Sequence, residues 1–171
     1  MGELFRRRPS TLDRAAFLQC QGRVYEHSPW IAETLWEAGL KPGHDEVNAL
    51  HRDLAAIVDA APRDRQLALL NAHPDLAGKL AVRGELTAES TSEQAGAGLD
   101  NCSPEEFRRF TELNAAYKAK FGFPFILAVK GKERAEILRN FEHRIHNAPE
   151  VEFRTALNEV HKIALLRLRE L

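Results

Sequence analysis

The stretch from Ser103 to Val129, SPEEFRRFTELNAAYKAKFGFPFILAV, decides the fold class of this 171-residue chain. It opens with a capping box, in which a serine is followed three positions later by Glu106, and with proline at the first helical position. Apolar side chains then recur at helical spacing as far as Phe121. Gly122 and Pro124 interrupt that pattern, so the stretch predicts a long amphipathic helix with a sharp end.

The five apolar residues Phe125 to Val129 are the one strand-like run in the sequence. A strand needs a partner, and no second run offers one. We therefore expect a buried extended segment that pairs in no sheet.

Helix signals dominate elsewhere in the chain. Ser28 and Pro29 predict a helix start, Gly39 a helix end, and Pro62 another start. Four glycines interrupt residues 73–100, where the apolar periodicity is weak. The sequence thus predicts an all-α protein. We expect a single compact domain over residues 1–171, with about eight helices and two irregular segments, 73–100 and 121–131.

Composition narrows the function classes. The chain is 44% hydrophobic and 29% charged, with a formal net charge of −1, as in soluble globular proteins. Its one basic cluster, Arg6-Arg7-Arg8, is too short for the broad basic face that nucleic-acid binding requires. No apolar run approaches the ~20 residues of a membrane span. Cys20 and Cys102 lie far apart, which favours free thiols in a reducing cytosol. We expect a cytoplasmic protein without nucleic-acid or membrane partners.

Three polar features fit this fold poorly. His73 precedes Pro74, which restricts its backbone to extended conformations just after a helix. If residues 89–94 are helical, Ser90, Glu93 and Gln94 share one face. Arg167 lies on the apolar stripe of the last helix, where it must snorkel, pair with a carboxylate or hold an anion. Packing, surface exposure and snorkelling, respectively, are the structural alternatives.

Cofactor and metal motifs are weak. No glycine-rich phosphate loop or dinucleotide fingerprint occurs in the sequence. His143 and His146 are three residues apart on one predicted helix, but a zinc site needs three or four ligands. We expect neither a cofactor nor a metal, although a zinc hydrolase that uses this pair and a non-enzymatic helical binding module are the rival hypotheses.

Several ordered segments together resemble one enzyme family. HPDLAG (73–78), YEHSPW (25–30), the Ser90-x-x-Glu93-Gln94 block with Ala97-Gly98-Leu99, and FGFPFILAVK (121–130) resemble blocks of the 2-oxo-4-hydroxy-4-carboxy-5-ureidoimidazoline (OHCU) decarboxylases of urate breakdown. The final helix, with Glu159-Val160 and Arg167-Leu168, is similar too. The resemblance spans residues 12–168.

The resemblance implies a site and a reaction. The catalytic pair would be His73 and Glu93. The small-molecule substrate OHCU would contact a larger set: Pro74, Ser90, Thr91, Ser92, Gln94, Phe125, Ile126, Leu127, Ala128, Val129 and Arg167. The reaction would give (S)-allantoin and carbon dioxide without a cofactor. Members of the family are often homodimers, so we expect a homodimer here.

The chemistry of these side chains indicates a role for each member of the catalytic pair. A histidine titrates near neutrality and suits a general acid. The carboxylate would orient the imidazole or steer the substrate, and spacing leaves open which of the two delivers the final proton. Unpaired backbone N–H groups in the extended segment would bind substrate oxygens.

Overall fold

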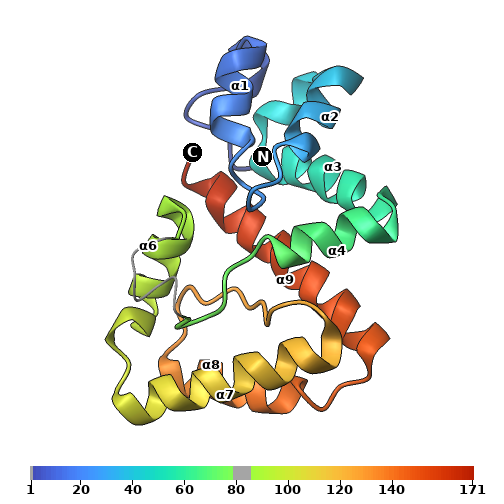
Figure 1. The fold of residues 1–171 in the computed structure, drawn as a ribbon. Helices are drawn as coiled ribbons and strands as arrows, with labels where there is room; N and C mark the ends of the chain where they lie inside the picture. Colours follow the sequence, from blue (N-terminus) through green and yellow to red (C-terminus); the bar gives the residue numbers. More distant parts are fainter. Residues whose placement is uncertain (1, 79–85) are drawn as a thin grey trace. The chain divides into compact units, whose positions relative to one another are not determined.

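The computed structural model describes residues 2–78 and 86–171 (Figure 1). Over these residues the chain forms eight α-helices and three short 3-10 helices. The same residues form no sheet, only an isolated bridge between Leu4 and Glu46. The all-α prediction is confirmed. The part of the first irregular segment from 79 to 85, including Gly84, lies outside the described residues.

The helices carry the labels of Figure 1. They are α1 (Arg14–Gln21), α2 (Trp30–Ala38), α3 (Val47–Ala60), α4 (Arg63–Asn71), α6 (Ala88–Gly96), α7 (Pro104–Phe121), α8 (Arg134–Arg144) and α9 (Pro149–Arg169). Because α6 lies inside 73–100, that segment is more regular than the sequence predicted. Its apolar periodicity is weak, but Thr87 caps the helix by accepting a hydrogen bond from the Ser90 N–H at 3.2 Å.

The chain divides into two compact units. The first consists of Met1–Ala72 and Val160–Leu171, and the second of His73–Glu159. Helix α9 begins in the second unit and ends in the first. The single-domain assignment over residues 1–171 stays a prediction.

The first unit is built around α3. Its apolar residues recur every three or four positions, and Val47, Leu50, Leu54 and Val58 are all buried. Helix α2 packs against α3 and also against α1, where the rings of Phe17 and Trp36 lie 5.3 Å apart. Burial of this apolar stripe holds the three helices together.

The second unit is built around α7 and α8, which lie side by side (Figure 1). The predicted capping box is present, since Ser103 and Glu106 exchange hydrogen bonds of 3.0 and 3.1 Å. Gly122 ends α7 in a left-handed conformation, with φ +81°, which favours glycine. Residues 124–129 then form neither helix nor strand, so the predicted segment Phe125–Val129, called the extended segment below, pairs in no sheet.

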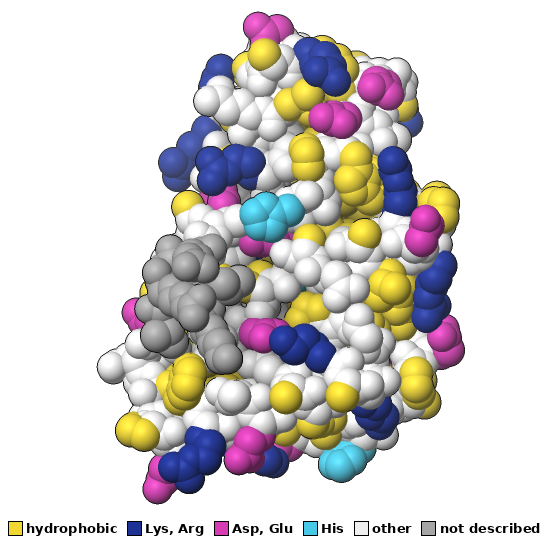
Figure 2. Space-filling model, in the orientation of Figure 1, with side chains coloured by type: hydrophobic (Ala, Val, Ile, Leu, Met, Phe, Trp, Pro, Cys, Tyr) yellow, Lys and Arg dark blue, Asp and Glu magenta, His cyan; other side chains and the backbone are white. Residues whose placement is uncertain are grey.

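Among the described residues, no helix is both long enough and apolar enough to cross a bilayer. On the face drawn in Figure 2, basic and acidic side chains are interspersed over most of the surface, and one group of basic side chains lies at the left of the upper half.

Candidate active site

His73 is the first residue of the second unit. Helix α4 ends at Asn71, and Ala72 caps it through backbone hydrogen bonds. The imidazole that follows is 8% exposed, and Pro74 beside it is partly exposed. His73 thus lies just after a helix end and before a proline, as the sequence predicted, and the structure adds that it is buried.

The turn after Pro74 is tight and partly strained. Ala77 has φ +51°, a left-handed conformation that costs a residue with a Cβ about 1 kcal/mol or more. A Cβ added at Gly78 would lie 2.7 Å from the Cβ of Asp75, so glycine is required where the chain folds back. This turn needs support from elsewhere in the unit.

Side chains from α6 and α7 supply that support. The Gln94 amide accepts from the Ala77 N–H at 3.0 Å and donates to the Asp75 carbonyl at 3.1 Å. Asn114 donates to the Leu76 carbonyl at 3.0 Å. Lys118 forms a more exposed ion pair with the Asp75 carboxylate at 2.8 Å.

Helix α6 presents the predicted face. Ser90 and Gln94 are buried and Glu93 is partly exposed. Thr91 and Ser92 are exposed. The helical spacing is confirmed, whereas substrate contacts at Thr91 and Ser92 stay predictions.

The segment Phe125–Val129 is buried throughout. The Ala128 N–H lies 3.4 Å from Oε1 of Glu159, a long hydrogen bond. Among the described residues, the N–H groups of Ile126, Leu127 and Val129 have no partner. Buried amides usually have partners, so these three N–H groups are candidate donors to a ligand.

A buried ion pair between Arg144 and Glu152 contacts the Phe125–Val129 segment. Arg144 donates to the Ile126 carbonyl at 2.6 Å, to Oε1 of Glu152 at 2.7 Å, and stacks over the Phe125 ring at 4.4 Å. The Glu152 side chain is fully buried and also accepts from the Tyr117 hydroxyl and from Asn147. Burial and the nearby Glu152 carboxylate raise the pKa of Tyr117, so this phenol stays a donor.

Sequence analysis missed this pair. The one signal was that Arg144 follows Phe141 by three positions, on the buried face of α8 that also carries Ile137. A charged residue on an apolar stripe predicts a buried partner, but it does not identify Glu152.

Arg167 belongs to the first unit. Its side chain is 6% exposed, and Nη1 lies 2.8 Å from a carboxylate oxygen of Glu26, which is 2% exposed. Nη1 also lies 3.5 Å from the Val24 carbonyl. Of the three alternatives for this arginine, the structure therefore shows pairing with a carboxylate, and Glu26 is the partner that sequence reasoning missed.

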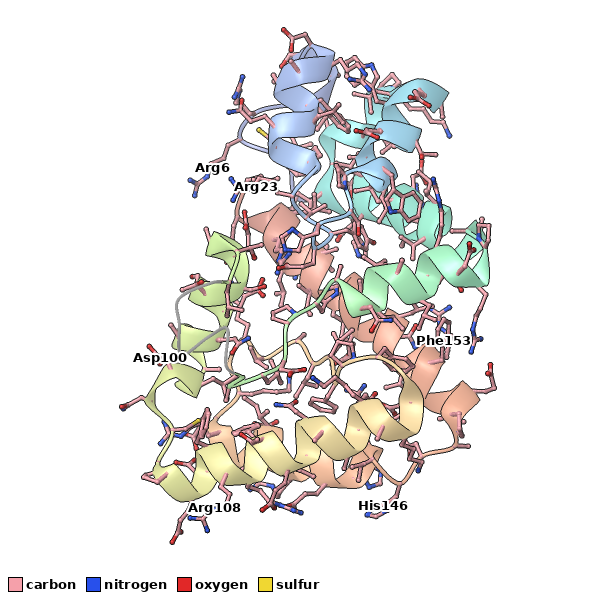
Figure 3. The ribbon with its side chains drawn as sticks, viewed as in Figure 1. Arg6, Arg23, Asp100, Arg108, His146 and Phe153 are labelled. Carbon is pink, nitrogen blue, oxygen red and sulfur yellow. The ribbon has the colours of Figure 1, made fainter. Side chains whose placement is uncertain are left out.

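The histidine pair proposed for zinc is exposed. His143 and His146 both lie on the surface of the second unit, and the His146 side chain points outward (Figure 3). Within residues 2–78 and 86–171, no group of three or more potential ligands could hold a metal ion.

The sequence that forms these two units matches one known protein family. The family model described as OHCU decarboxylase matches residues 10–169, which include both units' candidate residues. This chain belongs to the OHCU decarboxylase family.

Relatives and solved structures agree with this family assignment. An OHCU decarboxylase of Halalkalicoccus jeotgali is 44% identical over 159 residues, or 93% of this chain and 86% of the relative. The crystal structure of an (S)-allantoin synthase matches with TM-score 0.72 and 33% identity over 94% of this chain, which spans 51% of that protein. The structure of an OHCU decarboxylase in the presence of (S)-allantoin matches with TM-score 0.67 and 27% identity over 86% of this chain and 94% of that one.

Proposed function

We propose that this chain is an OHCU decarboxylase, which converts OHCU to (S)-allantoin and carbon dioxide without a cofactor. The observation that carries the proposal is the family match over residues 10–169. The buried His73 and the α6 face support it, as do the N–H groups of the extended segment that have no partner in the described part of the chain.

The substrate supplies the electron sink. Heterolysis of the bond between the ring carbon and its carboxylate releases carbon dioxide and leaves an electron pair on that carbon. The neighbouring imine-type C=N bond of the ring accepts this pair, so an enol forms that keeps the hydroxyl group of the substrate. The enol becomes a carbonyl group as its hydroxyl loses a proton, and protonation of the neighbouring, ureido-bearing carbon completes allantoin. The protein's work is to orient the carboxylate, stabilise the developing charge and protonate one face only.

We assign the general acid role to His73, because an imidazole can donate a proton near neutral pH. Glu93 is the second member of the pair, and it orients the imidazole or the substrate. Ser90, Thr91, Ser92 and Pro74 are the proposed lining of the substrate site.

The extended segment is proposed to bind the substrate's oxygens. Within residues 2–78 and 86–171, the N–H groups of Ile126, Leu127 and Val129 have no partner. They are donors fixed in a buried backbone, so they need no reorganisation during the reaction. Phe125 and Ala128 complete this segment of the site. Arg167, which pairs with Glu26, is proposed to bind substrate oxygens as well, as the family resemblance implies.

Two further expectations belong to this proposal. A homodimer follows from the family resemblance, and sedimentation of the purified chain tests it. A cytoplasmic location follows from the composition and the two free cysteines, Cys20 and Cys102.

The first prediction tests the proposed function directly. OHCU is made fresh from urate, and circular dichroism follows the formation of (S)-allantoin. We expect His73→Asn and Glu93→Gln each to lower the enzymatic rate by about 100-fold or more, which is the usual contribution of a general acid or its partner. The product should then form without stereochemical control.

His146→Asn is the matched control, because it makes the same change at an exposed histidine of the same unit. It should keep the parental rate. Parental formation of (S)-allantoin by His73→Asn would refute the acid assignment, and no turnover by the parent chain would refute the proposed function.

A further inference from the structure

We propose that Gln94 acts as a positioning residue, whose amide holds the turn after His73 in its active conformation. The inference rests on the proposed function. It assigns Gln94 a role through the protein backbone, rather than the direct contact with substrate that the family resemblance implies.

The first line of evidence is the pair of hydrogen bonds made by the Gln94 amide. Gln94 is 4% exposed, and both ends of its amide bond the backbone of one turn. Oε1 accepts from the Ala77 N–H at 3.0 Å and Nε2 donates to the Asp75 carbonyl at 3.1 Å. A single side chain thus spans the turn and fixes the separation of its two backbone groups.

The strain in the turn carries the second step. Ala77 donates its N–H to Gln94, and it is one of two non-glycine residues in the described chain with a positive φ. Alanine disfavours this left-handed conformation, so the turn tends to relax unless neighbouring groups hold it. Relaxation at Ala77 would move the backbone that leads through Pro74 to His73.

The position of Gln94 on α6 carries the third step. It directly follows Glu93, the proposed partner of His73. The amide therefore ties the helix that bears the carboxylate to the turn that follows the imidazole. Asn114 holds the same turn from α7, through the Leu76 carbonyl at 3.0 Å.

The test is a rescue experiment. Gln94→Met keeps the approximate volume and removes both hydrogen bonds, and we expect kcat to fall about tenfold while KM for OHCU changes little. Ala77→Gly relieves the strain, because glycine adopts positive φ freely. The double variant Gln94→Met/Ala77→Gly should therefore recover most of the parental kcat.

A second variant tests the same inference if Gln94→Met fails to fold. Asn114→Leu removes the other hydrogen bond to the turn, and Ala77→Gly should rescue it in the same way. Lys118→Met is the control, because it removes only the exposed ion pair to Asp75 and should leave kcat within twofold. Hydrogen exchange of the Ala77 amide should accelerate in Gln94→Met and not in Lys118→Met.

The outcomes separate the hypotheses. A Gln94→Met variant with raised KM, unchanged kcat and no rescue would mean that the amide binds substrate, which overturns the inference. Parental kinetics in that variant would overturn it too. Failure of the parent chain to turn over OHCU would instead refute the proposed function.

Discussion

Arg167 places a buried guanidinium on the apolar stripe of α9, and its partner there is the carboxylate of Glu26. Glu26 neutralises it at 2.8 Å, and both side chains are almost fully buried. We expect Arg167→Ala to raise KM for OHCU about tenfold with a smaller effect on kcat, because a binding contact present in both the ground and transition states is lost. Steady-state kinetics measures both constants.

The matched control is Arg169→Ala, which removes a more exposed arginine of the same helix, paired with Glu3 at 3.3 Å. It should leave KM unchanged. If Arg167→Ala also leaves KM unchanged while it lowers the free energy of unfolding, Arg167 serves only as the partner of Glu26.

For individual residues, the sequence predicted which ones were unusual but not which partners they have. His73 beside Pro74 and Arg167 on its stripe were visible from local spacing. Glu26 and Glu152 were not, because a carboxylate that is distant in sequence, or across a helix boundary, leaves no periodic signal. Partners of buried charges follow from tertiary packing rather than from local pattern.

The extended segment 125–129 depends on a helix for its shape. Arg144, at the end of α8, bonds the Ile126 carbonyl and Glu152 in a buried setting. Arg144→Leu leaves the Glu152 carboxylate buried without its ion partner, so we expect a loss of about 3–5 kcal/mol in the free energy of unfolding. Urea unfolding followed by far-UV circular dichroism measures this loss.

Two further variants provide free energies of unfolding with which the Arg144→Leu value can be compared. Tyr117→Phe removes one hydrogen bond to the same carboxylate and should cost about 1–3 kcal/mol. Arg144→Leu/Glu152→Leu removes both charges and should cost less than Arg144→Leu alone. A double variant as unstable as the sum of its single changes would contradict this account of the pair.

Helix boundaries show where elements were predictable. The serine, proline and glutamate at 103–106 placed the start of α7, because capping is a local interaction. Helix α6 was harder to predict, since it is short and polar and its stability comes from Thr87 capping and from buried Ser90 and Gln94. The unpaired segment 125–129 was predicted because a lone strand has no partner.

The whole chain is predicted to be one domain, although it forms two compact units. Helix α9 contributes to both, so unfolding one unit would cut a continuous helix within its length. Helix formation is cooperative, and a helix interrupted in this way loses stability on both sides of the break. We therefore expect the two units to unfold in one transition.

The two tryptophans make this prediction testable. Trp30 and Trp36 both lie in the first unit, whereas far-UV circular dichroism reports helices of both. The urea midpoints from fluorescence and from circular dichroism should coincide, as two-state unfolding requires. Lys162→Gly, an exposed change in α9 just inside the first unit, should lower both midpoints together by weakening the helix about 1 kcal/mol. Separate midpoints, or a shift seen by fluorescence alone, would mean that the units are independent domains, because a break in α9 would then leave the second unit folded.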